Sequence, residues 1–434
     1  MNAIGKFDRT SDALPLLKAA FAVGVQAANP ETELAAHLPD PPEGRLLVIG
    51  AGKAAASMAR VVERHYEGIP LEGMVITRYG HALSTDSIAV IEAGHPVPDR
   101  NGISATKQIL RILSSATERD LVLCLLSGGG SALLTAPTGV TLEQQAALTA
   151  ALLRSGADIV EMNCVRKHLS RVKGGWLAAA AAPARLVSLI LSDVVGDDLS
   201  TVASGPTVPD PTTYAEALDV LVRYQIDAPA ARAHFERGVD GRLPETPKPG
   251  DPVFTKAEYR LVASNQKSLE AVTAFFESRG IAAHFLSSTI TGEAREVAKV
   301  HAAIASHVLW NHQPFTPPCA LISGGETTVT VRGKGKGGRN SEFALALALA
   351  MPETQKLFVL AADSDGIDGS EENAGAFVTP QLFSTLPRYR ARQMLLNNDS
   401  YTAFAQTDHL FVTGPTHTNV NDFRILLLSD LGAG

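Results

Sequence analysis

Three glycine-rich segments of the sequence each follow a short apolar run, which places them at the ends of expected strands. Glycine lets the backbone turn so that successive N–H groups converge on one anion. A single segment of this kind is more typical of a tight turn, whereas three together predict a site for phosphate or polyphosphate. The residues expected to bind a cofactor in these segments are Gly50, Gly52, Ser127, Gly128, Gly129, Gly130, Ser131, Gly324 and Gly325.

The first segment, LLVIGAGKAAASMA at 46–59, carries Lys53 within it. Gly50, Gly52 and Ala55 fit the G-x-G-x-x-G/A pattern of dinucleotide-binding loops. That pattern also needs an acidic residue about 20 positions further on, where the sequence reads ITRYGH instead. Lys53 is followed by alanine, not by the serine or threonine of a P-loop. We therefore expect Lys53 to act as a catalytic charge on a phosphate group.

A basic, glycine-rich segment, VRGKGKGGRNSEFALALALA at 331–350, leads into an expected helix. Asn340 or Ser341 is the natural N-cap of that helix. A mobile basic loop before a helix suits closure over a triphosphate. We expect Arg339, which adjoins the cap, to be catalytic and to stabilise the transferred phosphoryl group. Glu326 and Asn340 are secondary cofactor-binding candidates, and the two lysines of the segment are expected to be solvated.

Aspartates follow two further apolar runs, with Asp193 in LSDVVGDD and Asp365 in AADSDGID. Carboxylates at strand ends hold Mg²⁺ together with substrate phosphates or orient a hydroxyl group. Asp193 is the candidate for activating a hydroxyl or for holding a metal, and Asp365 is a second metal candidate. A turn closed by Asx hydrogen bonds is equally compatible with any one of them. The second run fails the EF-hand pattern, because Asp368 stands where glycine is required.

The segment NCVRKHLSRVKGGWLA at 163–178 is basic and has helical periodicity. Its cationic face offers Arg166 and Arg171 as candidates for binding the carboxylate of a substrate. From the pattern alone, a solvated helix face is the favoured interpretation.

The elements that must position these residues are predicted from short apolar runs that alternate with Ala/Leu-rich segments of helical period. Nearly continuous apolar strands indicate burial on both faces, which is typical of parallel sheets covered by helices. A stretch rich in proline, glycine and charge at 236–259 indicates a linker, so we expect two domains, 1–245 and 246–434. The first is expected to be a Rossmann-like parallel sheet with helices on both faces.

Composition limits the function further. The chain has 434 residues with 45% hydrophobic and 19% charged residues, and its net charge of −7 argues against a nucleic-acid partner. Three distant cysteines form neither a metal-ligand pattern nor a disulfide framework, and we expect a cytoplasmic protein with no membrane span. The apolar segment at 13–28 is predicted to be an amphipathic helix rather than a signal peptide, because Lys18 interrupts it.

Several motifs together resemble the bacterial and archaeal glycerate 2-kinases that carry a C-terminal MOFRL domain. These are GAGKAA, GHPVPD, LLSGGGSALL, VRKHLSRVKGG, LSDVVGDDLSTVASGPTVPDPTT, SGGETTVTVRGKGKGGRNSEFALA, DSDGIDG and GPTHTNVND. The resemblance implies two α/β domains, the second of MOFRL type, with the active site in the cleft between them. It implies transfer of the γ-phosphoryl group of ATP to the 2-hydroxyl of D-glycerate with Mg²⁺ or another divalent cation. Lys53 and Arg339 match residues that serve the phosphates, and a homodimer is left open.

The sequence departs from this family pattern at two positions, with His417 where glycine is usual and Ser364 where threonine is common. Two other functions are also compatible with the residues. An NAD(P)H-dependent hydroxypyruvate reductase would use the glycine fingerprint, with Arg78 suited to a 2′-phosphate. A sensor that binds phosphorylated metabolites without turnover would use the same glycine-rich segments.

Overall fold

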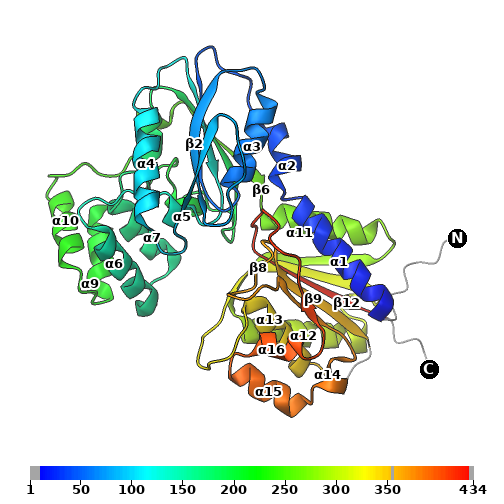
Figure 1. Cartoon of the computed structure of the whole chain (residues 1–434). Helices are drawn as coiled ribbons and strands as arrows, with labels where there is room; N and C mark the ends of the chain where they lie inside the picture. The colour runs from blue at the N-terminus through cyan, green and yellow to red at the C-terminus, as the bar shows by residue number, and fades with distance from the viewer. Residues whose placement is uncertain (1–9, 353–355, 430–434) are drawn as a thin grey trace. The chain divides into compact units, whose positions relative to one another are not determined.

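A computed structural model describes residues 10–352 and 356–429 of the chain. The chain divides into two compact units, which are treated separately below (Figure 1). The parallel-sheet unit is formed by Pro30–Val262. The mixed-sheet unit is formed by the chain up to Asn29 together with the chain from Ala263 onward.

These limits differ from the expected domains 1–245 and 246–434 for a packing reason. The N-terminal helix α1 (Thr10–Gln26) is present as predicted, but it packs in the mixed-sheet unit, where the Phe21 ring contacts the rings of Phe411 and Phe423. At the other limit, the linker-like stretch 236–259 runs into strand β6 (Ala257–Ala263), which joins the first sheet. Amphipathic patterning predicts a helix but does not identify the surface on which it packs.

The parallel-sheet unit contains a six-stranded sheet in the order β3-β2-β1-β4-β5-β6, and the strands from β1 to β5 pair in parallel. This order matches the doubly wound nucleotide-binding fold, in which the chain reverses direction across the sheet between β1 and β4. Ligands of such sheets bind beyond the carboxyl ends of the strands at that switch point. The expected Rossmann-like sheet is therefore confirmed. Its remaining strands are β1 (Leu46–Ala51), β2 (Leu71–Arg78), β3 (Ile88–Ala93), β4 (Leu121–Leu126) and β5 (Arg185–Leu191).

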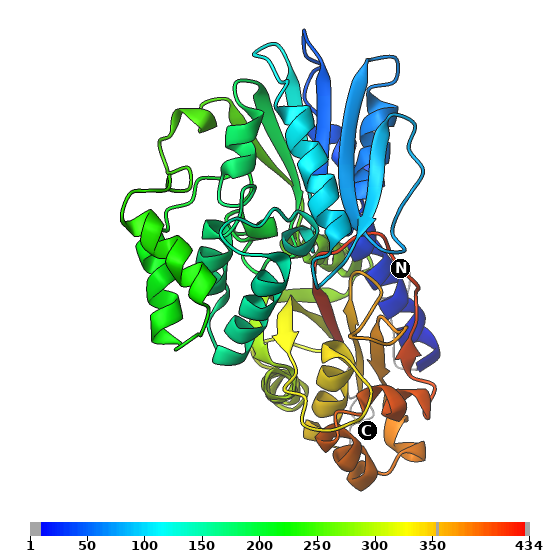
Figure 2. The ribbon, with the colours of Figure 1, turned by 60° about the vertical axis from the view of Figure 1, so that its left-hand side comes forward.

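Helices cover both faces of this sheet (Figures 1 and 2). On one face, α4 and α8 join the strands in a buried apolar cluster, and α3 packs on the other face. Burial on both faces explains why β1 and β4 are apolar at every position. The helices and short 3₁₀ turns of the unit are α2 (Pro30–Glu33), η1 (Leu34–His37), α3 (Ala55–His65), α4 (Arg100–Leu113), α5 (Gly130–Leu133), α6 (Leu142–Ser155), α7 (Ile159–His168), α8 (Trp176–Ala181), η2 (Val202–Ser204), α9 (Tyr214–Arg223), α10 (Pro229–Val239) and η3 (Pro252–Phe254).

A group of four helices, α6, α7, α9 and α10, forms a separate apolar core within the same unit (Figure 2). Three of these helices begin at capping boxes, whose N-cap residues are Thr141, Asp158 and Thr213. In each box, the N-cap side chain accepts a backbone N–H and a glutamine or glutamate three positions on returns the bond. The sequence thus sets the start of α7, the helix that carries Arg166.

The mixed-sheet unit also has a six-stranded sheet, in the order β11-β10-β9-β12-β8-β7. Only the β7–β8 pair is parallel among the pairings of the described residues, and the other four are antiparallel. Parallel pairing of these strands was expected from their apolar runs, and the structure corrects it. The runs reflect burial on two faces, because α1 and α11 cover one face and α12 and α13 the other. Apolar continuity therefore predicts burial but not strand direction.

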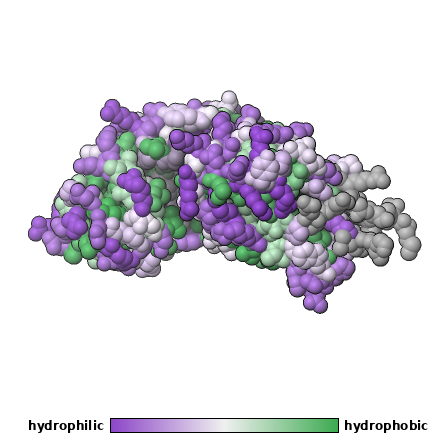
Figure 3. All heavy atoms as spheres, turned by 90° about the horizontal axis from the view of Figure 1, so that it is seen from below, coloured by the Kyte–Doolittle hydropathy of each residue, from purple (hydrophilic) through white to green (hydrophobic). Residues whose placement is uncertain are grey.

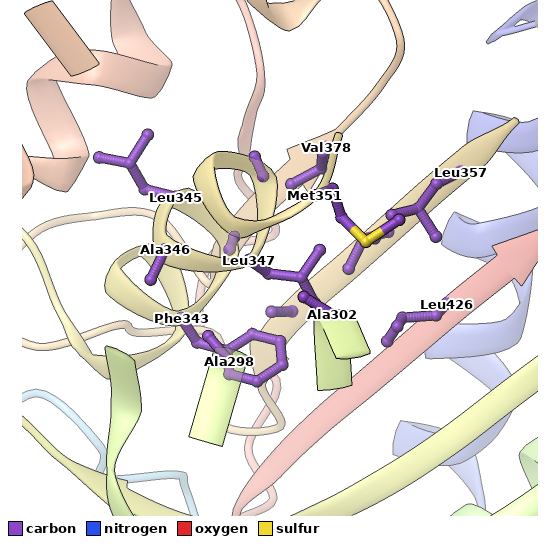
Figure 4. Close-up of a cluster of buried hydrophobic side chains, with 14 of the residues drawn as sticks. Ala298, Ala302, Phe343, Leu345, Ala346, Leu347, Met351, Leu357, Val378 and Leu426 are labelled. Atoms are coloured by element: carbon purple, nitrogen blue, oxygen red, sulfur yellow. The ribbon is translucent and has the colours of Figure 1, made fainter. Parts of the chain in front are cut away.

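The mixed-sheet core lies between α12, α13 and the sheet (Figure 4). Phe343 and Leu347 of α13 lie there with Ala302 of α12 and with Leu357 and Leu426 from two strands. The elements of this unit after α1 are α11 (Asn265–Glu277), β7 (Ala282–Glu293), α12 (Ala294–Asn311), β8 (Cys319–Thr328), α13 (Arg339–Ala350), β9 (Leu357–Asp363), β10 (Gly375–Val378), α14 (Leu382–Thr385), α15 (Arg388–Leu396), α16 (Ser400–Ala405), β11 (Leu410–Phe411) and β12 (Asp422–Leu428).

Hydrophilic and hydrophobic residues are interspersed on the face drawn in Figure 3. Leu153, Trp310 and Leu396 are among the large apolar side chains that remain exposed. Single exposed apolar residues are normal on protein surfaces and do not by themselves indicate docking. Within the described ranges, no helix has both the length and the apolar character needed to cross a membrane.

Candidate functional site

The loop that contains Lys53 is tied to the loop that follows β4. The N–H of Lys53 donates to the carbonyl of Gly128 at 2.8 Å. The N–H of Ala54 donates to Ser127 Oγ at 3.0 Å. The N–H of Gly52 is also used, by the carbonyl of a residue in β2. The amides that a dinucleotide-binding loop would offer to a pyrophosphate are therefore taken up by the protein itself.

Gly50 and Gly52 are needed for the close approach of these two loops. A Cβ at Gly50 would lie 2.2 Å from the carbonyl oxygen of Leu125. A Cβ at Gly52 would lie 2.0 Å from Ser127 Oγ, and the φ of Gly52 is +146°. The structure thus gives both glycines a packing role, whereas the sequence suggested that they bind a cofactor.

The second loop keeps backbone donors available. None of the described residues accepts a hydrogen bond from the N–H of Gly128, Gly129 or Ser131. Gly129 has a φ of +83°, and a Cβ there would lie 2.9 Å from the His95 ring and 3.5 Å from Lys53 Cγ. The stem of Lys53 and the ring of His95 therefore flank Gly129 at the switch point of the sheet. Convergent amides beside a lysine are an arrangement that suits an anion.

Next to this loop, a cavity of about 170 Å³ is lined by both polar and cationic groups. Arg166 of α7, Lys173, His95 and Ser131 contribute to its wall, and no aspartate or glutamate of the described residues does. The Lys173 ammonium is buried and donates to the carbonyls of Ser131 at 2.7 Å and Leu134 at 2.8 Å. Burial, and secondarily repulsion from Arg166, lowers the pKa of Lys173 to about 7.

Arg166 is partly buried, and the described residues give its guanidinium neither a hydrogen-bond acceptor nor an ion-pair partner. Burial alone lowers its pKa from the ordinary value for arginine. A guanidinium in such a position is a ready partner for a ligand carboxylate or phosphate.

The rest of the basic segment does not form a solvated helix face. Lys167 is buried against Asp210, with Nζ and Oδ1 3.3 Å apart. His168 is buried and bonds Glu245 at 3.1 Å. Helix α7 ends at His168, so Arg171 lies beyond it on an exposed turn and does not line the cavity. Of the two arginines proposed to bind substrate, the structure therefore places only Arg166 at the cavity.

The aspartates after β5 occupy a loop with turn hydrogen bonds. Asp198 accepts from the N–H of Ser200 at 2.9 Å and from the hydroxyl of Thr201 at 3.0 Å. These bonds hold its pKa below the ordinary value despite the opposing effect of burial. Asp193 lies two residues after β5 and is partly exposed, at the same end of the sheet as the loops after β1 and β4.

In the mixed-sheet unit, Arg339 is surrounded by carboxylates. Its Nη2 lies 2.6 Å from Asp363 Oδ2, and its Nε lies 2.7 Å from Asp422 Oδ1. Glu326 is more distant, at 3.6 Å from Nη1. Although burial opposes the charge, these carboxylates raise the pKa of Arg339 well above its ordinary value. For Asp363, burial raises the pKa well above its ordinary value, although the charge of Arg339 acts to lower it.

The first amides of α13 are also occupied. The carboxylate of Asp368 accepts from the N–H of Asn340 at 2.9 Å and from that of Ser341 at 2.8 Å. The helix begins at Arg339 after Gly338, so the predicted caps Asn340 and Ser341 are wrong. Asn340 is fully buried and donates through Nδ2 to Asp422 at 2.8 Å. The start of this helix is therefore closed by the chain's own acid instead of being open to a phosphate.

The basic glycine-rich segment 331–338 is held in place instead of forming a mobile loop. The side chain of Asn398 accepts the N–H groups of Arg332 and Gly333 at 2.8 and 2.9 Å. Further along, Asp399 accepts the N–H of Lys336 at 3.0 Å.

Gly324 and Gly325 lie inside β8, not in a loop after it. A Cβ at Gly324 would lie 2.0 Å from Asn265 Oδ1. A Cβ at Gly325, whose φ is +111°, would lie 2.3 Å from the carbonyl oxygen of Ile290. These glycines allow close packing of the strand, and the expected loop at this point is corrected.

The two metal candidates, Asp193 and Asp365, lie in different units. Asp365 accepts the N–H of Ile367 at 2.9 Å, which is the Asx turn that the sequence left open. Within 10–352 and 356–429, no group of three or more histidine, cysteine, aspartate or glutamate side chains is arranged to hold a metal. The described donors thus do not form a protein cage for Mg²⁺, although Mg²⁺ bound through phosphates needs only one or two carboxylates.

At position 417, where the family pattern has glycine, the backbone conformation is one that glycine adopts most readily. His417 has a φ of +60°, in the left-handed region that favours glycine. At the other departure, Ser364 is buried and its hydroxyl accepts the N–H of Val420 at 2.8 Å.

Sequence reasoning missed three residues of these sites. In the sequence, Lys173 is one charge of a basic segment, and Asp422 lies in a motif that predicts no role for it. In the sequence, Asp368 stands out only as the residue that breaks the EF-hand pattern, and nothing there predicts that it caps a helix. A lysine directly before a Gly-Gly pair is the signal that could have identified Lys173 as a buried loop anchor.

The comparisons with known proteins cover nearly the whole chain. Residues 16–236 match the family described as "Domain of unknown function (DUF4147)", and residues 319–422 match the MOFRL family. A protein of Agrobacterium vitis, provisionally named a hydroxypyruvate reductase, is 46% identical over 95% of this chain and 94% of its own. The D-glycerate 2-kinase of Thermotoga maritima is 40% identical over 93% of this chain and 95% of its own. The crystal structure of glycerate kinase from Thermotoga maritima is similar with a TM-score of 0.87 at 38% identity, covering 96% of this chain and 100% of that one.

Proposed function

Because the chain belongs to the glycerate kinase family, we propose that it is an ATP-dependent glycerate 2-kinase. In this reaction the 2-hydroxyl oxygen of D-glycerate attacks the γ-phosphorus of ATP. The bond from that phosphorus to the β–γ bridging oxygen breaks, the hydroxyl proton is lost, and ADP and 2-phosphoglycerate are formed. Such a transfer depends on positioning and charge neutralisation more than on covalent catalysis by the protein.

One observation of the site supports the proposal best. The loop after β4 presents unused amides at Gly128, Gly129 and Ser131, and the stem of Lys53 lies against Gly129. Amides and an ammonium group at the switch point of a parallel sheet neutralise a phosphoryl group that gains negative charge. We assign Lys53 to that group.

Arg339 is proposed to serve the phosphates from the mixed-sheet unit. Its guanidinium is fixed by Asp363 and Asp422, so its orientation is set before a ligand arrives. Asp193 is proposed to accept the proton of the hydroxyl or to contribute a metal ligand, since it follows a strand at the functional edge of the sheet.

We further propose that ATP is used with Mg²⁺ or another divalent cation, which would neutralise charge on the phosphates. The described residues form no dedicated cage for a metal, which is compatible with a cation delivered on the phosphates. Asp365 and Asp193 are the proposed protein ligands. A cytoplasmic location is proposed because Cys124, Cys164 and Cys319 are all buried and unbridged.

A second candidate, NAD(P)H-dependent hydroxypyruvate reduction, is favoured by the name of the Agrobacterium vitis relative. The glycine fingerprint does not support it structurally, since the amides of Lys53 and Ala54 are already bonded to the loop after β4. The acidic residue expected to bind a ribose is also missing after β2, which ends at Arg78.

A paired assay separates the two functions. Purified protein is incubated with D-glycerate, ATP and Mg²⁺, and in parallel with hydroxypyruvate and NADPH. We expect ADP to form only when D-glycerate is present, with no NADPH oxidation above the protein-free rate. Oxidation of NADPH without any glycerate-dependent ADP would overturn the kinase assignment. Activity in neither assay would favour a sensor that binds without turnover.

A further inference from the structure

The cavity lined by Arg166 and Lys173 has positively charged side chains in its wall but no negatively charged side chain among the described residues to balance them. Two cationic side chains line it, and no carboxylate of the described residues does. Placing a cation in a partly buried site costs free energy, so uncompensated cations in a cavity indicate a function that needs them. The missing counter-charge is therefore expected to come from a ligand.

The other polar groups of the cavity are mostly donors. Gln145 is buried and lines the wall, and its Oε1 accepts from the hydroxyl of Thr135 at 3.5 Å. No described residue accepts a hydrogen bond from its amide nitrogen. Arg166 likewise has no hydrogen-bond acceptor among the described residues. Lys173 donates two hydrogen bonds to backbone carbonyls. A lining of donors without anionic acceptors fits a ligand that is itself an anionic acceptor.

The geometry of the groups favours a carboxylate. The guanidinium of arginine is a planar fork that pairs with both oxygens of a carboxylate. The volume of about 170 Å³ suits a small acid. Ser131 belongs both to this wall and to the loop with unused amides, so a small acid here would have its remaining atoms close to that loop.

We propose that this cavity binds the carboxylate of a small hydroxy acid, with Arg166 as its direct partner and Lys173 as a second cation. The proposal rests on the assigned kinase reaction only for the identity of the acid, D-glycerate. Lys173 also holds the segment 131–134 through its two carbonyl contacts, so it is a positioning residue as well. The cavity thereby selects acids over neutral alcohols.

The first test compares Arg166→Gln with Arg154→Gln. Arg154 is an exposed arginine on α6 and does not line this cavity. We expect the KM for D-glycerate to rise ~100-fold or more in Arg166→Gln, because a charged hydrogen-bonded pair is lost. The KM for ATP should stay near that of wild type, and Arg154→Gln should match wild type for both substrates. Equal KM values for D-glycerate in the two variants would overturn the proposal.

The second test measures binding without turnover. Calorimetry follows D-glycerate, glycerol and inorganic phosphate titrated separately into protein without ATP. We expect wild type to bind D-glycerate and not glycerol, and Arg166→Gln to lose this preference. Binding of D-glycerate by a protein that forms no glycerate-dependent ADP in the paired assay would refute the kinase assignment and leave the acid site standing. Binding of phosphate but not D-glycerate would overturn the acid site.

The melting temperature distinguishes an arginine that binds a ligand from one that only stabilises the fold. Arg166 has no partner among the described residues, so replacing it leaves no acceptor unsatisfied. Arg166→Met should therefore keep or raise the melting temperature of the ligand-free protein while losing D-glycerate binding. A lower melting temperature together with normal binding would contradict the proposal.

Lys173 gives an independent signature. Arg166 on α7 and His95 before α4 are the other charged or titratable groups of the cavity lining. With the pKa of Lys173 lowered to about 7, a bound carboxylate should draw a proton onto it at about pH 8. Calorimetry in buffers of different ionisation enthalpy should show proton uptake in wild type and none in Lys173→Met. Identical uptake in the two proteins would exclude Lys173 as the second cation.

Discussion

The two units treat buried cations in opposite ways. In the parallel-sheet unit, Arg166 and Lys173 line a cavity without a carboxylate among the described residues. In the mixed-sheet unit, Arg339 contacts Asp363 at 2.6 Å and Asp422 at 2.7 Å. The first arrangement leaves positive charge for a ligand to neutralise, whereas the second neutralises it within the fold.

This difference separates two kinds of cationic side chain: those that await an anionic ligand and those that stabilise the fold through carboxylate partners. A compensated arginine contributes to stability because its removal leaves buried carboxylates without a partner. An uncompensated one lowers stability until a ligand binds. Arg339 is therefore expected to combine a functional role with a structural one, while Arg166 is expected to be functional only.

The largest effect is expected at Arg339. Arg339→Met takes the ion-pair partner from the buried Asp363 and leaves Asp422 with Arg424 alone, which should lower the free energy of unfolding by ~3–5 kcal/mol. Arg332→Met, at an exposed position seven residues earlier, is the control and should be neutral. Urea unfolding monitored by circular dichroism gives both values. A midpoint for Arg339→Met equal to that of the control would contradict the compensated-charge account.

The effect of replacing Lys53 should appear in turnover. Lys53→Met is expected to lower kcat by about 10²–10³-fold, since a charge at the transferred phosphoryl group is lost. Lys334→Met removes an exposed lysine and should leave kcat unchanged. Steady-state assays with saturating D-glycerate and ATP measure the effect. Near-normal turnover in Lys53→Met would remove this lysine from the reaction.

Acid should weaken the mixed-sheet unit through His301. Burial lowers the pKa of His301 to about 4 from 6.5, and its Nε2 bonds the hydroxyl of Ser323 at 2.8 Å. Because the folded state binds the proton less readily, stability is full above pH ~6.5 and falls towards pH ~4, by up to ~3 kcal/mol. Urea unfolding at a series of pH values should show this slope, and His301→Gln should flatten it. The same slope in both proteins would show that other groups cause it.

The smallest effect is expected at His417, whose φ is +60°. His417→Gly should raise the free energy of unfolding by at most ~1 kcal/mol, because the left-handed backbone is unstrained for glycine. Val412→Gly, at an exposed position without a positive φ, should instead lose stability. Thermal unfolding of both variants measures the contrast. A loss of stability in both would mean that His417 is not strained.

The residues at the carboxyl end of the parallel sheet could be predicted from the sequence, because each of them directly follows its own apolar strand. Lys53 and Gly128 each follow an apolar strand, and the carboxyl ends of neighbouring parallel strands meet at one edge. The basic segment with Arg166 was also recognisable, although its burial was not. The ends of strands and the types of side chains there are thus readable from sequence.

The surroundings of Arg339 could not be predicted, because they depend on strand order in a mixed sheet. Asp363 ends β9 and Asp422 begins β12, and antiparallel pairing sets these residues opposite each other. Nothing in an apolar run specifies that pairing or its direction. The packing of α1 in the mixed-sheet unit likewise depends on contacts of Phe21 far along the chain.

The most direct test of the central claim is the position of the new phosphate on the product. Wild-type protein is incubated with D-glycerate, ATP and Mg²⁺, and the product is examined by proton-coupled phosphorus NMR. Phosphate on the 2-oxygen couples to a single carbon-bound proton and gives a doublet, which is the result we predict. A triplet from coupling to two protons, as expected for phosphate on the 3-oxygen, or the absence of any phosphorylated acid would contradict the account.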